Sequence, residues 1–363
     1  MHNEQNNAEE RWRAVDVLKG FGVLGMVAAH SITWWFIYPT YRLPVGSETA
    51  FSVAFIIFGA LVMFLPVAGG IALWYMSRKA YDASTRSFAI WRSGFALTMI
   101  VRAAILATLG TVMTVVTWGP SYAGAWNVLQ FYALSLVCLT ITLGIGGVRA
   151  VWALGIFSFI TAWFVLDIQL FLAPTFVSNI LFGNPSSIHI WPLFPWLYII
   201  VIGFAVAELY NWAQRNALVT QLLWWWASLG ILTLVLIIFT YELPAPQLQA
   251  SGIWDFSARP PVLLIIAMIS VFFITLPLIE WSQKKIHQLP ITIFEAIGYA
   301  VLPVYLLHMP SAFRYFNGFA KDKDSHIWLG IGFLLQLLLV CLVTICLTYY
   351  RKRDLAVSTA AHT

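Results

Sequence analysis

Charged side chains are scarce in this sequence of 363 residues. Asp, Glu, Lys and Arg make up 10% of the chain, whereas 61% of the residues are hydrophobic and the mean hydropathy is +0.82. Soluble domains carry about 25% charged residues, and so few charges do not cover the surface of a water-soluble fold. The composition therefore excludes a soluble enzyme, a disordered chain and a secreted disulfide scaffold. It predicts a polytopic membrane protein.

Cysteine, metal-ligand patterns and nucleotide-binding loops are also rare or missing. The three cysteines (Cys138, Cys341 and Cys346) lie within apolar runs, so we expect free thiols and no disulfides. The sequence has no His, Cys and Asp set at metal-ligand spacing, and no Walker or dinucleotide-binding loop. We therefore expect no metal, ATP or NAD. The net charge of +5 is explained by basic cytoplasmic loops, without nucleic acid as a partner.

Long apolar runs fill most of the chain. A helix needs about 20 apolar residues to cross the hydrocarbon core. On that basis the sequence predicts an all-α transmembrane bundle with about ten spans, at 15–37, 51–76, 93–117, 126–145, 148–170, 193–212, 221–241, 261–280, 291–309 and 327–350. Residues 1–14 form a polar N-terminal segment, 15–350 one transmembrane domain, and 351–363 a tail. Within the second span, Gly69-Gly70 is expected to let helices approach closely or bend.

The distribution of basic residues predicts the orientation of these spans. If the N-terminus is inside, fourteen of the 20 Lys and Arg residues lie on the cytoplasmic side, five lie outside, and Arg102 lies within a span. Cytoplasmic loops of membrane proteins carry the excess of Lys and Arg. We therefore expect both termini in the cytoplasm and the protein in the plasma or inner membrane.

Ionisable residues within the spans are the first candidates for a site, because each is costly in the bilayer. Asp16, Lys19 and His30 fall on one face of the first span, since eleven or fourteen steps of 100° return close to the same direction. Asp16 and Lys19 could instead be an interfacial pair that orients the helix. Arg102, in the third span, either snorkels to the interface or binds a phosphate or carboxylate within the bundle.

A second layer of polar residues is expected nearer the outer face. His308, in the ninth span, is predicted at a depth close to that of His30, and either histidine could also be a satisfied core residue. The same layer contains Asn127, Gln130 and Asp167. Together with Lys19 and Arg102 below, this layer predicts a site reached from both faces of the membrane. The remaining polar groups (His2, His287, His326, His362, Glu208 and Glu280) are expected to be solvated, and His189 has only a weak claim to the site.

Five segments together resemble one family. The run Val15 to His30 resembles the first helix of the membrane acyltransferase superfamily, which comprises the acyltransferase-3 and heparan-α-glucosaminide N-acetyltransferase-like proteins. These typically begin Asp-x-x-Arg-Gly, with a histidine 14 residues after the aspartate. This sequence has Lys19 in place of the arginine, which keeps the charge but loses bidentate geometry. The other similar segments, in matching order, are Phe64–Gly70, Asn127–Gln130, Pro192–Trp196 continuing to Gly203, and Val304–Pro310.

The resemblance implies a membrane acyltransferase. The acyl group, acetyl in the first instance, would come from cytoplasmic acyl-CoA and pass to a hydroxyl or amine of a glycan or lipid-linked acceptor at the outer face. The roles that it suggests are His30 and His308 in catalysis and Lys19 and Arg102 in binding donor phosphate. Substrate binding or support falls to Asp16, Asn127, Gln130, Asp167, Trp196 and Tyr305. His308, Asn127 or Gln130 could orient His30 or donate a hydrogen bond to the developing oxyanion. Direct attack and an acyl-His30 intermediate both remain open.

Two other classes of function fit the same residues. A small-solute permease would use His30, His308 and Asp167 to bind solute or relay protons. The sequence has no convincing inverted repeat or pair of broken helices, which disfavours this class. A non-catalytic membrane protein that organises an assembly is the third class, in which the polar groups would only pair with one another.

Overall fold

The chain forms a bundle of long helices. The computed structural model describes residues 12–37, 57–78, 80–82, 87–88, 90–91, 94–173, 175–183, 191–240, 262–285, 289–310 and 326–360. The helices in these ranges are α1 (Arg13–Ile37), α3 (Phe64–Arg78), α4 (Phe95–Trp118), α5 (Val128–Trp163), α6 (Val165–Phe171), α7 (Phe176–Phe182), α8 (Leu193–Arg215), α9 (Val219–Thr240), α11 (Val262–Lys285), α12 (Leu289–Tyr299), α13 (Val301–Pro310) and α15 (His326–Ala360), with the 3-10 turn η1 (Pro120–Tyr122). The described strands, β1 (Tyr81–Asp82) and β2 (Ser87–Phe88), form one short antiparallel ladder.

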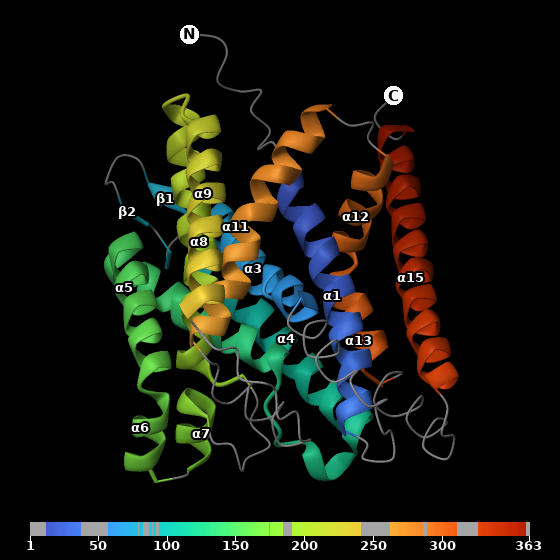
Figure 1. The fold of residues 1–363 in the computed structure, drawn as a ribbon, viewed down its shortest axis with the longest axis horizontal. Helices are drawn as coiled ribbons and strands as arrows, with labels where there is room; N and C mark the ends of the chain where they lie inside the picture. Colours follow the sequence, from blue (N-terminus) through green and yellow to red (C-terminus); the bar gives the residue numbers. More distant parts are fainter. Residues whose placement is uncertain are drawn as a thin grey trace.

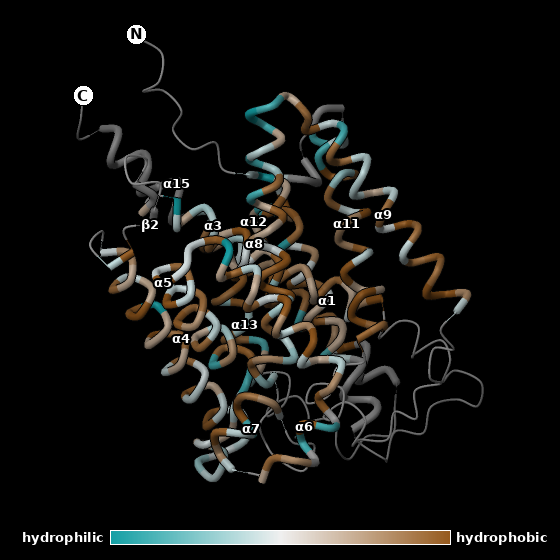
Figure 2. The backbone as a smooth tube through the Cα atoms, turned by 90° about the vertical axis from the view of Figure 1, so that its left-hand side faces the viewer, coloured by the Kyte–Doolittle hydropathy of each residue, from teal (hydrophilic) through white to brown (hydrophobic). Residues whose placement is uncertain are grey.

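Most of these helices are long and apolar enough to cross a membrane. Among the described residues, eight pass by length and composition, or nine if the bent pair α12–α13 is one span. This number treats α5 as one helix, although Gly147 (φ 62°, ψ −154°) interrupts it where the fourth and fifth predicted spans meet. Figure 2 shows apolar residues along much of these helices. The prediction of an all-α transmembrane bundle is therefore confirmed.

The start of α1 and the end of α15 lie at the same end of the bundle (Figure 1). α15 continues to Ala360, through most of the segment that the sequence suggests as a tail. The two helices also contact each other. An even number of membrane crossings would give this arrangement.

Glycines allow two helix pairs to approach closely. A Cβ atom on Gly298 of α12 would overlap the carbonyl oxygen of Asp16, and one on Gly20 of α1 would overlap that of Phe294. In the same way, a Cβ atom on Gly70 of α3 would overlap a backbone carbonyl of α8. The expected close approach at Gly69-Gly70 is therefore confirmed, and small residues at such contacts are typical of membrane helices.

The ninth predicted span, 291–309, is broken in two. α12 and α13 meet at Ala300 with a bend of 69°. Pro303 explains the break, because proline lacks an N–H and its ring clashes with the carbonyl four residues earlier, that of Tyr299. The bend lets α12 pack along the first part of α1 while α13 places Tyr305 and His308 beside the last part.

Candidate active site

The two histidines of the outer polar layer form a hydrogen-bonded pair. Nδ1 of His30 lies 2.8 Å from Nε2 of His308. The ring planes differ by 12° and the centroids are 5.1 Å apart, so the imidazoles meet edge to edge in nearly one plane. His308 is fully buried, whereas His30 is partly buried and lines a cavity. The sequence predicts similar depths for His30 and His308, and in the structure their rings are in direct contact.

The backbone determines which histidine donates in this pair. Nδ1 of His308 lies 3.1 Å from the carbonyl oxygen of Val304, which can only accept a hydrogen bond. Neutral His308 therefore carries its proton on Nδ1, and its Nε2 is an acceptor. It follows that Nδ1 of neutral His30 donates to His308 and that the basic lone pair of His30 is on Nε2. This is the tautomer that a neutral base needs to accept a proton at Nε2.

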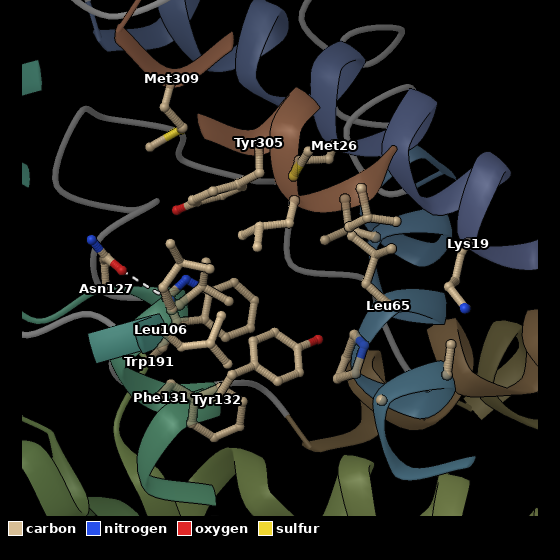
Figure 3. A pocket seen from close by; sticks show the side chains of 18 of the residues that line it. Lys19, Met26, Leu65, Leu106, Asn127, Phe131, Tyr132, Trp191, Tyr305 and Met309 are labelled. Atoms are coloured by element: carbon tan, nitrogen blue, oxygen red, sulfur yellow. Dashed lines mark hydrogen bonds between the residues drawn. The ribbon is translucent and has the colours of Figure 1, made fainter. Parts of the chain in front are cut away.

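His30 opens on a cavity of about 410 Å³ enclosed by α1, α3, α4, α5, α12 and α13. Lys19 also lines it, and Figure 3 shows Lys19 on one side and Asn127 with Met309 toward the other. The walls between them are mainly aliphatic and aromatic. Cavities of this size and character are typical small-molecule sites.

Lys19 is held at its side of the cavity by Asp16. Their charged atoms are 2.7 Å apart, and the aspartate side chain is almost completely buried. One helical turn away, Arg13 of α1 pairs with Glu295 of α12 at 3.1 Å. The first turns of α1 therefore carry ion pairs that fix the helix, and Lys19 still reaches the cavity.

Arg102 lines a second cavity of about 340 Å³. The two cavities adjoin, because they share the lining residues Gly69, Ala72, Leu106, Tyr132 and Leu302. The guanidinium contacts Sδ of Met76, and no ion pair with Arg102 occurs within the described part of the chain. Ser135, which also lines this cavity, has a buried hydroxyl without a hydrogen-bond partner among the described residues. An anion would be the natural complement to this site.

Asn127 and Gln130 have their amide groups engaged in the fold. Asn127 caps α5 through the N–H of Leu129, and its Nδ2 donates to the carbonyl of Gly110 (3.0 Å) and the hydroxyl of Thr114 (2.7 Å). Gln130 completes the capping box by accepting from the N–H of Asn127, and its own Nε2 donates within the α4–α5 connection. Both amides therefore join α4 to α5, although Asn127 also lines the cavity.

Five aromatic residues line the cavity: Phe131, Tyr132, Trp191, Tyr299 and Tyr305. Tyr305 of α13 was expected from the sequence, whereas Tyr132 of α5 and Trp191 before α8 were not. Figure 3 shows the hydroxyls of Tyr132 and Tyr305 projecting into the cavity. Trp191 has a positive φ of 66°, which is uncommon for a bulky residue and often occurs at functional sites. No periodic pattern marks Tyr132 and Trp191 as site residues, because their place in the wall depends on packing between distant helices.

Five of the predicted site residues line neither cavity. Asp16, Gln130 and His308 hydrogen-bond Lys19, Asn127 and His30, which do, and the other two are Asp167 and Trp196. Asp167 is exposed on the short helix α6, away from the residues that line the two cavities. Trp196 is buried in α8, and its ring centroid lies 4.3 Å from that of Trp191. Trp196 therefore packs against Trp191, which lines the cavity, but does not line the cavity itself.

The prediction for Glu280 was wrong. It is buried in α11 rather than solvated, and it accepts a hydrogen bond from the indole N–H of Trp12. The hydroxyl of Tyr210 lies 3.5 Å from the same carboxylate, and its ring stacks on Trp12. Aromatic donors can satisfy a buried carboxylate, so this group ties the start of α1 to α8 and α11. Glu208, at 3.1 Å from the indole nitrogen of Trp152, is also partly buried.

Comparison with known families identifies the family of this chain. The family model described as "Heparan-alpha-glucosaminide N-acetyltransferase, catalytic" matches residues 11–239, more than half of the chain. The matched region contains Lys19, His30 and Arg102, whereas His308 and Tyr305 lie beyond it. No curated protein matches the chain. This chain belongs to the family of heparan-α-glucosaminide N-acetyltransferase catalytic domains, and its fold is that of a multi-pass membrane protein.

Proposed function

We propose that this protein transfers an acyl group, acetyl in the first instance, from acyl-CoA to a hydroxyl or amine of a glycan or lipid-linked acceptor. Family membership supports an acetyltransferase-type membrane enzyme. The observation that carries the finer proposal is the His30–His308 pair at a cavity whose other side holds Lys19. A base, a cation and an apolar passage between them are what an acyl-CoA thioester requires.

The separation of Lys19 and His30 suits the pantetheine arm of coenzyme A. Eleven residues of α-helix rise about 16 Å. The arm joins its sulfur to the first phosphorus through about thirteen bonds, which by extended-chain geometry span roughly 15 Å. A thioester placed at His30 therefore puts the first phosphate close to Lys19. The ammonium group would then make a charge-assisted hydrogen bond to that phosphate.

Arg102 is proposed as a second cation for the donor. It lies seven residues into α4, and Lys19 lies six residues into α1, so both are about 10 Å from the starts of their helices. The positive-inside distribution predicts that these starts face the cytoplasm, where acyl-CoA is supplied. The acceptor would then approach the histidine pair from the outer face.

His30 is proposed as the general base. Its Nε2 takes the proton from the acceptor hydroxyl or amine as that atom forms a bond to the thioester carbonyl carbon. The carbon–sulfur bond then breaks, and the imidazolium returns the proton to the departing CoA thiolate. His308 is a positioning residue, because its bond to Val304 fixes the tautomer of both rings.

The proposal is tested with purified full-length protein, acetyl-CoA and a panel of amino sugars and hydroxyl-bearing saccharides. Wild-type protein should release CoA thiol and acetylate at least one acceptor. His30→Ala should lower kcat by about 10²–10⁴-fold, the usual contribution of a positioned base. His287→Ala, at a histidine that the sequence places in a loop, is the matched control and should retain full activity. A folded His30→Ala protein with unchanged kcat would remove His30 from catalysis.

A proton-relaying permease is the weaker alternative. It would join Asp167 to the two histidines, but Asp167 is exposed on α6 and lines neither cavity. Counterflow of an unmodified solute in vesicles without acyl-CoA would favour that alternative.

A further inference from the structure

Acyl transfer requires a hydrogen-bond donor for the oxygen of the attacked thioester. When the carbonyl carbon becomes tetrahedral, its oxygen takes a negative charge in a mainly apolar cavity. Fixed donors directed at that oxygen commonly contribute 10²–10³ in kcat. The base itself cannot serve, since Nδ1–H of His30 is directed to His308.

The amides expected to donate here are already engaged. Both N–H bonds of Asn127 Nδ2 are directed at α4, to the Gly110 carbonyl and the Thr114 hydroxyl. Gln130 Nε2 faces the hydroxyl of Thr111 and the carbonyl of Ala125. The N–H of His308 is directed to Val304. Each group would have to break a native bond to reach an oxyanion.

Tyr305 differs from these groups, because it lies beside the histidine pair and its hydroxyl faces the cavity. It lies one turn before His308 on α13, and the two rings meet edge to face with centroids 5.6 Å apart. Tyr305 also packs with Met26, which lies one turn before His30 on α1. The phenol is therefore fixed relative to both members of the histidine pair. Its hydroxyl projects into the cavity and has no hydrogen-bond partner among the described residues (Figure 3).

We infer that Tyr305 is a catalytic residue whose phenol O–H donates a hydrogen bond to the oxyanion of the thioester. This inference rests on the proposed acyl transfer. As the acceptor attacks, its proton goes to Nε2 of His30 and the carbonyl π electrons move to the oxygen, which Tyr305 stabilises. As the carbonyl re-forms, the carbon–sulfur bond breaks, the sulfur leaves with the electron pair, and His30 protonates it. Tyr305 keeps its own proton throughout.

Tyr132 offers a comparison within the same cavity. Its hydroxyl also projects into the cavity and has no hydrogen-bond partner among the described residues, but its ring comes from α5, at the junction with the Arg102 cavity. Its ring packs on Phe131, whereas the ring of Tyr305 packs on His308. Tyr198 is a comparison outside the site, because its buried hydroxyl has no partner in the described structure and lines neither cavity.

The experiment compares Tyr305→Phe, Tyr132→Phe and Tyr198→Phe in the full-length protein with acetyl-CoA and the acceptor found for the wild type. Tyr305→Phe keeps the ring packed on His308, so it should fold normally, lower kcat by about 10²–10³-fold and leave the Kd for acetyl-CoA within about twofold. Tyr198→Phe should match the wild type, and Tyr132→Phe should change KM more than kcat. A Tyr305→Phe protein with kcat within about threefold of wild type overturns the inference.

The wild-type result separates this inference from the proposed function. If wild-type protein turns over, His30→Ala is inactive and Tyr305→Phe is active, the inference is wrong and the proposed function stands. If wild-type protein binds no acetyl-CoA and transfers no acetyl group, both are wrong.

Discussion

Nδ1 of His30 and Nε2 of His308 lie 2.8 Å apart, although 278 residues separate them in the chain. The Val304 carbonyl makes this contact directional, because it requires the proton of His308 to be on Nδ1. The pair is therefore more than two polar residues that satisfy each other. The basic nitrogen of His30, Nε2, lies on the edge of its ring that is turned away from His308.

Replacing His308 tests this directional arrangement. His308→Phe preserves a ring of similar size but removes both nitrogens, so His30 loses the acceptor that fixes its tautomer. We expect kcat to fall by about 10²-fold or more, toward the limit set by loss of base catalysis. Isothermal titration should give an unchanged Kd for acetyl-CoA, since Lys19 is untouched. A kcat close to wild type would show that His30 does not need His308.

Lys19 should determine donor affinity rather than the rate of chemistry. A hydrogen bond to a charged group contributes about 1.5–3 kcal/mol, so Lys19→Gln should raise the Kd for acetyl-CoA by about 10–100-fold. The loss should shrink as salt increases, because salt screens the wild-type interaction. Arg215→Gln removes an exposed cation at the end of α8 and is the matched control. Equal effects of the two substitutions would contradict a specific phosphate contact.

Arg102 should recognise charge in the adjoining cavity. Arg102→Gln is expected to weaken acetyl-CoA binding, and Arg102→Lys should recover part of the affinity because a lysine keeps the charge without the planar fork. The comparison uses competition binding of acetyl-CoA and of dephosphorylated pantetheine. Arg102→Gln should affect only acetyl-CoA. An equal loss for the uncharged pantetheine would indicate a packing effect and contradict phosphate recognition.

Asn127 should matter for stability more than for chemistry. Asn127→Ala removes an N-cap, which costs about 0.5–2 kcal/mol, and removes one of the two side-chain donors to the Gly110 carbonyl, the other being the Thr114 hydroxyl. We expect a lower thermal unfolding temperature, while the folded fraction keeps kcat within about threefold of wild type. A kcat loss of 10²-fold without a thermal shift would instead make Asn127 the oxyanion donor.

The close contact between Gly298 and the Asp16 carbonyl should make position 298 sensitive to a larger side chain. Gly298→Ala puts a methyl group against the Asp16 carbonyl, and overpacking of this kind costs about 1–3 kcal/mol. The thermal unfolding temperature should fall. Gly124→Ala is the control, because a Cβ atom there has no neighbour within 4 Å among the described residues. Equal unfolding temperatures for the two variants would show that α1 and α12 can separate without cost.

The sequence predicted depth along the helices well and contacts between helices poorly. The rise and hydrophobic length of each span place His30 and His308 at one level, and their contact follows once α1 and α13 are neighbours. No such rule predicted Tyr132, whose position depends on how α5 packs on α4 and on how closely its ring approaches Gly69 of α3. Asp167 shows the same limit, because it has the expected polarity but its short helix directs it away from both cavities.

Breaks in helices were only partly predictable. The sequence predicts separate spans at 126–145 and 148–170, and Gly147, which lies between them, interrupts α5. The sequence predicts one continuous span over 291–309, but α12 and α13 are separate helices. Pro303 explains the break, because in a continuous helix its ring would clash with the carbonyl of Tyr299. The burial of Glu280 could not be predicted, because its donors are distant in the sequence: Trp12 directly precedes α1 and Tyr210 belongs to α8.

The most direct test of the central claim is an electron density map of the protein bound to a non-hydrolysable acetyl-CoA analogue. The account predicts the acyl carbonyl between His30 and Tyr305, the arm along the cavity past Tyr132, and the first phosphate within hydrogen-bonding reach of Lys19. A map in which the analogue binds elsewhere, or in which its phosphates lie on the histidine side of the cavity, would contradict it.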